Sequence, residues 1–241
     1  SLHDALPIYR TQAYYDSGKW RATWAGEGGG VLINQAPHNL DLWQWIFGMP
    51  VRLRASCYTG KYHNIEVEDE AAVYAEYENG ATAVFLTSTG EFPGTNRLEI
   101  TGDRGKIVIE DGSLRLWELD VSERMFCYSD KKEINQPSFT YQELTPHQAE
   151  TAHAGILQNF TDAILHGSEL IAPGYDGINE LSISNAAYLS AWTDQWVDLP
   201  VNGDDFLEQL RKRVEGSKGK AIPSEADAPS GRYHTRWSIK W

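Results

Sequence analysis

The strongest limit on the fold of this chain is a hairpin signal near its middle, Asn79-Gly80. The pair lies inside the stretch EAAVYAEYENGATAVFLTST, between two runs rich in β-branched and aromatic residues. Asn-Gly readily adopts the positive φ angles of a two-residue hairpin turn. The stretch therefore predicts two strands paired antiparallel.

Further strand patterns surround this hairpin. VRLRASCYT alternates apolar and polar residues with a period of two, and the turns GDRG and EDGS separate NRLEI, KIVIE and LRLWEL. SFTYQEL adds another candidate strand. From Val51 to about Leu119 we therefore predict an antiparallel meander of at least five strands, with one face on a core and the other facing water or a partner.

Helical patterns bracket the predicted sheet. One helix opens with Thr145 as N-cap, Pro146 at its first position and Gln148 completing a capping box, and ends at Gly167. Its apolar stripe consists of Ile156, Phe160 and Ile164.

Two more helices and a tail follow. One is expected from Asp176 to about Trp196, and a shorter one from Asp204. The residues expected on the buried side of the first are Ile178, Leu181, Leu189, Trp192 and Trp196. The last 25 residues, rich in Ser, Pro, Gly and Ala, predict a tail or wrapping arm.

Charge and composition argue against several classes of protein. A net charge of -13 repels phosphate backbones, which argues against nucleic-acid binding. No apolar run approaches the roughly 20 residues that span a bilayer, and the first residues lack the features of a secretory signal. We expect no membrane partner and a cytoplasmic location. The two cysteines lie far apart, which argues against a disulfide framework or a zinc site.

The stretch GGGVLINQAPHNLDLWQWIFG holds the best chemical candidate, His38. Asn34 and His38 are spaced to share one face of a helix, with Asp41 most of a turn further on. Pro37 should kink or restart the helix just before His38 and so expose the imidazole. The alternative is a buried core histidine whose ring bonds Asn34 or Asp41. Asp41 could also orient His38.

A metal site and a dinucleotide-binding loop are two other interpretations of this region. A metal site built on His38 and Asp41 would need a third ligand, for which His63, Glu66, Glu68 and His153 are available and none is selected by spacing. AGEGGGV imitates a dinucleotide-binding fingerprint, but Val31 replaces the third glycine. The preceding WRATW is also too short and polar for the required strand, so phosphate binding is not predicted here.

Several longer stretches resemble one enzyme family. YRTQAYYDSGKWRATWAGEGGGVLINQAPHNLDLWQWIFGMP resembles the start of the C-terminal domain of the Gfo/Idh/MocA oxidoreductases, which include glucose-fructose oxidoreductase and inositol dehydrogenase. NRLEITGDRGKIVIEDGSLRL, HAGILQNFTDAILHG and APGYDGINELSISNAAYLSAW are similar to later parts of that domain. The resemblance covers roughly residues 9–215.

The resemblance implies an α+β fold: an open, mostly antiparallel β-sheet with helices packed on one face. In the family this domain forms the substrate pocket, and often the dimer contact, beside an N-terminal Rossmann domain that binds NAD or NADP. No Rossmann fingerprint occurs in this sequence, and residues 1–8 resemble no segment of the family. We expect those residues to be a non-native leader or the mark of a truncated reading frame, and residues 216–241 to be the tail.

The resemblance also implies roles for individual residues. His38 falls on the family's catalytic histidine, a general base, and Asn34 on a position that is often aspartate. A neutral amide cannot stabilise an imidazolium as a carboxylate would, but it can bond a sugar hydroxyl. Asn34 is therefore interpreted as a substrate-orienting group. Gly29 and Gly30 would let the backbone approach the cofactor or substrate.

Other residues are candidates for the substrate pocket. Four aromatic or basic side chains precede the glycines, and packing of a surface loop is the alternative for them. The expected substrate-binding residues are Tyr14, Trp20, Arg21, Trp24, Asp41 and His153.

Three functions are consistent with the sequence. We favour the substrate-binding and catalytic half of an NAD(P)-dependent oxidoreductase that acts on a sugar, a polyol or a derivative. It would form a homo-oligomer through the open sheet face and be inactive alone. A non-catalytic sugar-binding or assembly module on the same fold is the second. A metal-assisted lyase or hydrolase using His38 and Asp41 is the third.

Overall fold

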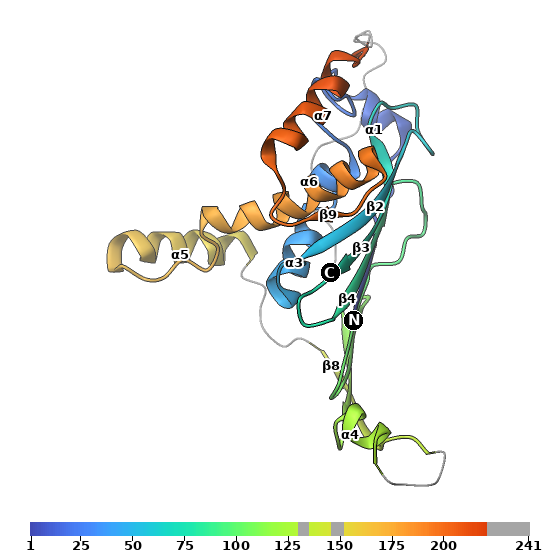
Figure 1. Ribbon diagram of the computed structural model, residues 1–241. Helices are drawn as coiled ribbons and strands as arrows, with labels where there is room; N and C mark the ends of the chain where they lie inside the picture. Colours follow the sequence, from blue (N-terminus) through green and yellow to red (C-terminus); the bar gives the residue numbers. More distant parts are fainter. Residues whose placement is uncertain (130–134, 146–151, 221–241) are drawn as a thin grey trace.

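A mixed sheet of nine strands forms the framework of the protein in its computed structural model, which describes residues 1–129, 135–145 and 152–220 (Figure 1). Every neighbouring pair in the sheet is antiparallel except β1 and β4. In sheet order the strands are β8 (Phe139–Leu144), β7 (Ser113–Leu119), β6 (Gly105–Glu110), β5 (Arg97–Gly102), β1 (Leu2–Pro7), β4 (Thr82–Ser88), β3 (Glu68–Glu76), β2 (Arg52–Thr59) and β9 (Val197–Asp198).

The predicted hairpin is confirmed, but the predicted meander is wrong at one point, because β1 lies between β4 and β5 and separates them. β3 and β4 pair antiparallel across the Asn79-Gly80 turn, where Gly80 has a φ of +79°. The Asn79 side chain accepts a hydrogen bond from the Ala81 N–H at 3.0 Å. The strands predicted from NRLEI, KIVIE, LRLWEL and SFTYQEL form β5 to β8.

The strand β1 was not predicted. Its backbone runs parallel to β4 on one side and antiparallel to β5 on the other, so it lies in the centre of the sheet. Residues 1–8 are those expected to be a non-native leader. Strand pairing uses backbone groups that every non-proline residue carries, so it does not depend on where the segment comes from. The non-native origin of residues 1–8 therefore stays a prediction.

Helices lie on one face of the sheet, which confirms the α+β class with one open face (Figure 1). The helical segments are α1 (Gln12–Asp16), α2 (Val31–Asn34), α3 (Pro37–Phe47), α4 (Glu123–Cys127), α5 (Ala152–His166), η1 (Gly174–Asp176), α6 (Gly177–Thr193) and α7 (Gly203–Glu215). The core lies between β2 to β4 and the helices α3 and α6, where Trp43 stacks on Phe85 with ring centroids 5.9 Å apart.

The expected buried side of the α6 region is wrong in part. Leu189 is buried, but Ile178, Leu181 and Trp196 are exposed by 63%, 48% and 38%. The buried residues of α6 begin only at Ile183, in the half of the helix that packs on the sheet. The start of α6 extends past that contact, so its apolar side chains have no sheet to cover them.

The helix α5 and the predicted tail are described only in part. α5 ends at His166, before Gly167 with a φ of +68°, while the predicted N-cap region of that helix lies partly outside the described residues. In the tail, Ser217 and Lys218 bond the Glu66 carboxylate at 2.5 and 2.7 Å, and residues after 220 lie outside the described part. None of the described helices combines the length and the apolar character needed to cross a membrane.

We predict that Trp43→Ala lowers the free energy of unfolding by about 3 to 5 kcal/mol, because it removes a fully buried ring from the contact between α3 and the sheet. Trp45→Ala is the matched control, since this side chain on the same helix is 75% exposed; we expect a change within about 0.5 kcal/mol. Urea unfolding of both variants measures the difference. Equal losses would contradict the described packing.

Candidate functional site

His38 lies exposed at a break between two helices. α2 ends at Asn34 and α3 begins at Pro37, which occupies the first helical position. The predicted restart before His38 is therefore confirmed. Within residues 1–129 no hydrogen bond joins His38 to Asn34 or Asp41, so the buried core histidine is ruled out.

A polar network surrounds Asn34, four residues earlier. The Tyr14 hydroxyl donates to Asn34 Oδ1 at 3.3 Å and accepts from Arg21 Nη1 at 2.9 Å. Gln35 Nε2 donates to the same Asn34 oxygen at 2.8 Å and lies 3.3 Å from the Tyr14 hydroxyl. The Asn34 amide nitrogen donates to Glu27 Oε1. The structure thus brings together Tyr14, Arg21 and Asn34, three of the expected site residues, and adds Glu27 and Gln35.

Glu27 is the main residue that the sequence analysis missed. Its second carboxylate oxygen accepts the Ala22 N–H at 2.6 Å. Burial raises the pKa of Glu27, while the Ala22 N–H, the Arg21 charge and Asn34 oppose that shift. The one signal in the sequence was an acid inside a glycine-rich run, AGEGGGV. The amide nitrogen of Asn34 therefore donates to Glu27, and its amide oxygen accepts hydrogen bonds from Tyr14 and Gln35.

Arg21 supplies a buried positive charge to this network. Only 4% of it is exposed, and its guanidinium lies 4.5 Å from the Tyr14 ring centroid and 4.3 Å from that of Trp20. Such cation–π contacts favour a charge that has left water. Trp20, half exposed, thereby covers the network from outside.

The glycines ahead of α2 allow close contact with the protein's own core. A Cβ on Gly30 would lie 2.0 Å from the Glu68 carbonyl oxygen, and one on Gly29 would lie 2.3 Å from the Tyr188 hydroxyl. Both glycines are buried. A contact from Gly29 or Gly30 to a cofactor stays a prediction.

Glu68 fixes this loop from below. Its carboxylate accepts the Gly30 N–H at 3.0 and 3.1 Å, the Leu32 N–H at 3.0 Å and the Tyr188 hydroxyl at 2.6 Å. Burial raises the pKa of Glu68 to about 7, although these donors favour the ionised form. Because Glu68 occupies the N–H groups at the start of α2, they cannot hold a phosphate.

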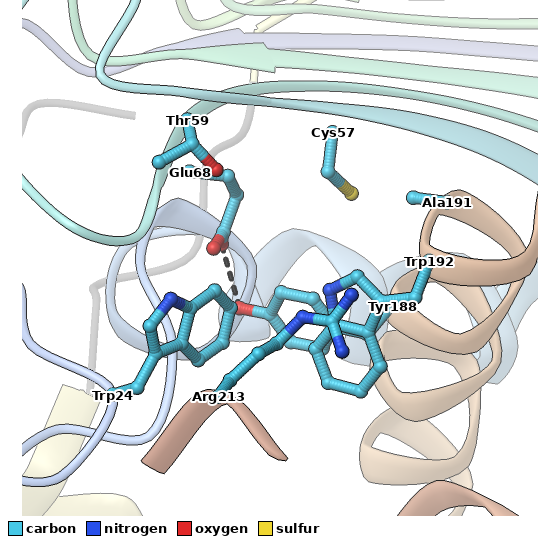
Figure 2. Close-up of a pocket in the computed structure, with 8 residues that line it drawn as sticks. All are labelled: Trp24, Cys57, Thr59, Glu68, Tyr188, Ala191, Trp192 and Arg213. Carbon is cyan, nitrogen blue, oxygen red and sulfur yellow. Dashed lines mark hydrogen bonds between the residues drawn. The ribbon is translucent and has the colours of Figure 1, made fainter. Parts of the chain in front are cut away.

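Trp24 lines a cavity that is bordered by Glu68 and Tyr188. Its ring contacts Tyr188 and Trp192 edge-on, at centroid distances of 5.8 and 5.6 Å. The cavity, of about 140 Å³, is shown in Figure 2. Its lining residues are Trp24, Cys57, Thr59, Glu68, Tyr188, Ala191, Trp192 and Arg213.

The other expected site residues lie apart from the network. Asp41 is exposed on α3 and accepts a hydrogen bond from Gln44 at 2.9 Å. His153 is exposed near the start of α5, which extends away from the sheet and from α1 (Figure 1). Within the described ranges, no three His, Cys, Asp or Glu side chains form a group that could hold a metal ion.

Comparison with known proteins finds a likeness to one family. Residues 7–108 match the family described as the GFO/IDH/MocA C-terminal domain. This match covers less than half of the chain. D-apiose dehydrogenase of Rhizobium rhizogenes is 28% identical over 177 residues, which are 70% of this chain and 48% of that protein. The chain thus spans about half the length of this relative.

Solved structures show the same fold. The WlbA dehydrogenase from Bordetella pertussis, in complex with NADH and UDP-GlcNAcA, matches with a TM-score of 0.63 and 22% identity, over 83% of this chain and 54% of that one. A levoglucosan dehydrogenase in complex with NADH and levoglucosan matches with a TM-score of 0.64 and 18% identity, over 83% and 59%. These identities support the fold alone.

We predict that Asn34→Asp destabilises the protein above neutral pH, because it replaces the donor to Glu27 with a second carboxylate. The free energy of unfolding at pH 8 should fall by about 1 to 3 kcal/mol. Most of the loss should return at pH 5, where one proton relieves the repulsion, or in the double variant Asn34→Asp/Glu27→Gln. Denaturant titrations of the cycle test this. Additive effects of the two substitutions would show that the pair does not interact.

A second prediction concerns Glu68. The pKa of Glu68 is about 7 in the folded protein, compared with an ordinary value of 4.5. Between these two pH values the folded state therefore binds more protons than the unfolded state. The free energy of unfolding should therefore fall as pH rises from about 4.5 to 7. Between pH 5 and pH 8 the wild type should lose about 2 to 3 kcal/mol more than Glu68→Gln, which cannot titrate. Parallel pH profiles would refute the assignment.

Proposed function

We propose that this domain binds the substrate and transfers the proton in an NAD(P)-dependent oxidoreductase that acts on a sugar, a polyol or a derivative. The observation that carries the proposal is the exposed His38 at the break between α2 and α3, four residues after Asn34 and its polar network. The domain is shared with D-apiose dehydrogenase and, as a fold, with other sugar dehydrogenases.

His38 would act as the general base. As the neutral imidazole, it accepts the proton of a substrate hydroxyl while the C–H bond on the same carbon breaks and a carbonyl forms. A nicotinamide cofactor, NAD or NADP, would supply the hydride acceptor when bound, which would balance the proton that His38 accepts. Because His38 is exposed, the proton can then pass to water. Such a base contributes about 10²- to 10⁴-fold to the rate.

The network beside His38 would orient the sugar. Asn34 uses both acceptor positions of Oδ1 and one of its two N–H groups inside the protein, which leaves one N–H for a substrate hydroxyl. Tyr14, Arg21 and Glu27 keep that N–H in one direction. Groups held in this way need no reordering when the substrate binds.

The residues present fit one part of a nicotinamide cofactor. An exposed imidazole suits the reacting end, where only a proton acceptor is required. The loop before α2 does not suit the phosphates, because Glu68 already accepts its Gly30 and Leu32 N–H groups. We propose that the cofactor is held mainly by protein outside residues 1–241. The relatives contain additional chain that could supply such a part.

Copies of the chain are proposed to associate through the open face of the sheet. Alternate residues of β2, β3 and β4 present Tyr58, Tyr74 and Leu86 there, exposed by 49%, 39% and 48%. Beside them, Arg97 and Arg115 pair with Glu110. Near the aromatic side chains of this face the charges are paired as well, as in Arg52–Glu76 and Arg54–Asp194, so the face can be buried without an unpaired charge.

The test is oxidation of a panel of sugars and polyols with NAD or NADP by the complete gene product, followed by absorbance of the reduced cofactor. We expect His38→Ala to lower kcat/KM by 10²-fold or more and to leave the free energy of unfolding within about 0.5 kcal/mol, since the side chain is exposed. His166→Ala, another exposed histidine, is the control. Turnover that survives in His38→Ala refutes the assigned role. Sugar binding without turnover by the wild type would favour the non-catalytic binding module.

A further inference from the structure

We propose that the chain after α7 forms a strap, residues 217–220, which positions the loop of Arg21 and Glu27 and, through it, the Asn34 amide that meets the substrate. The inference rests on the proposed function and assigns Lys220 as a further positioning residue for its site. α7 lies at the end of the molecule that also carries α1, so the chain that follows it is close to this loop (Figure 1).

The loop between α1 and α2 contains a backbone turn that its own sequence does not favour. Ala22 is fully buried and has a φ of +53°, in the left-handed region that alanine rarely adopts. Such a conformation persists only where the surrounding structure fixes it. The Ala22 N–H donates to Glu27 Oε2 at 2.6 Å, and the Ala22 carbonyl accepts the Glu66 N–H at 3.2 Å. The positions of Arg21 and Glu27 depend on this turn.

Glu66 joins this loop to the strap. While its backbone N–H bonds Ala22, its carboxylate accepts the Ser217 hydroxyl at 2.5 Å and the Lys218 N–H at 2.7 Å. Burial acts to raise the pKa of Glu66, but hydrogen bonds such as these two lower it, which favours the ionised form that accepts both. The Ser217 hydroxyl also accepts the Ala25 N–H at 3.4 Å. The strap and the loop are therefore fixed relative to each other.

Lys220 ties the strap to the other end of the loop. Gly219, with a φ of +66°, allows the backbone to turn just before it. The Lys220 ammonium donates to the Tyr15 carbonyl at 2.8 Å and lies 3.5 Å from Asp16 Oδ1, at the end of α1. Only 17% of the side chain is exposed, so most of it has left water. Contacts from the strap thus reach both ends of the loop.

The charge of Lys220 also acts on Glu27. Burial raises the pKa of Glu27, and the positive charges of Arg21 and Lys220 are among the effects that oppose this rise. The Glu27 carboxylate accepts the Asn34 amide on one oxygen and the Ala22 N–H on the other. Lys220 therefore favours the form of Glu27 that holds both the turn and the Asn34 amide. It acts on the substrate through Glu27 and Asn34, which makes it a positioning residue.

The experiment compares Lys220→Met and Lys220→Arg in the complete gene product, with Lys218→Met as the matched control. Lys218 carries the same charge in the same strap, but its side chain is exposed and its bond to Glu66 uses the backbone N–H. Hydrogen exchange of the peptides that contain Ala22 and Glu66 measures the hold on the loop. The kcat and KM values for the sugar measure the effect on the site.

For Lys220→Met we expect exchange at least fivefold faster and a KM about tenfold higher, with kcat within about twofold of the wild type. A loosened Asn34 amide weakens the binding of substrate and transition state alike, which raises KM and leaves kcat. Lys220→Arg should restore both readouts, because a guanidinium keeps the charge and can donate to the Tyr15 carbonyl. Lys218→Met should behave as the wild type.

Three results would overturn the proposal. Unchanged exchange in Lys220→Met would show that the strap does not hold the loop. Faster exchange with an unchanged KM would leave the strap a structural role alone. Equal effects of Lys218→Met and Lys220→Met would show that net charge matters and the position of Lys220 does not.

Failure of the proposed function is distinct from these results. If the wild type binds a sugar without turnover, the catalytic role of the domain fails, and the dissociation constant of the sugar replaces KM in the same comparison. If turnover depends on His38 while Lys220→Met changes neither exchange nor KM, the proposed function is retained and the strap is refuted.

Discussion

The buried carboxylate of Glu68 is the interaction on which the arrangement of the candidate site depends. It extends from β3 to the loop before α2 and to Tyr188 of α6, and so joins sheet, loop and helix at one point. Removing a carboxylate from water costs several kcal/mol unless donors replace the lost solvation. Here the donors are the N–H groups that begin α2. The direction of α2, and with it the position of Asn34, follows from this contact.

The loop that Glu68 holds has two different sides. Gly29 and Gly30 face inward, and a Cβ on Gly30 would overlap the backbone of Glu68. Glu27 faces the polar network and has its pKa raised by burial. A single stretch of chain thus carries a packing requirement on one side and an electrostatic arrangement on the other. That division explains why glycines and a single acid alternate there.

Much of the fold could be predicted from local patterns. The hairpin at Asn79-Gly80, the strands on both sides of it and the break before His38 follow from turn chemistry and from proline, which act over a few residues. β1 could not be predicted this way, because its pairing joins residues about 80 positions apart and its sequence has no strand pattern. The exposure of Ile178 and Leu181 was missed for a related reason. Helical periodicity shows which residues share a face, but not whether another element covers that face.

The candidate site was predictable to a similar degree. His38, Asn34, Tyr14 and Arg21 follow from spacing and resemblance, and three of them meet in one network. Glu27 gave no periodic signal, and Trp24 is close to the others in sequence but faces a different cavity. Asp41 and His153 are polar residues near recognisable motifs, yet their side chains lie apart from the network. Which neighbours in sequence become neighbours in space depends on the path of the loop that Glu68 fixes.

One face of α3 carries His38 together with the exposed side chains of Leu42, Trp45 and Ile46, and their relative direction depends on helical phase. Each residue of an α-helix advances by about 100° around the axis. Deleting or inserting one residue between His38 and Leu42 would turn the imidazole about 100° away from the side chains of Leu42, Trp45 and Ile46. All four side chains would still be present, but they would no longer share one face. The length of this short segment is therefore as tightly constrained as the identity of the residues at its ends.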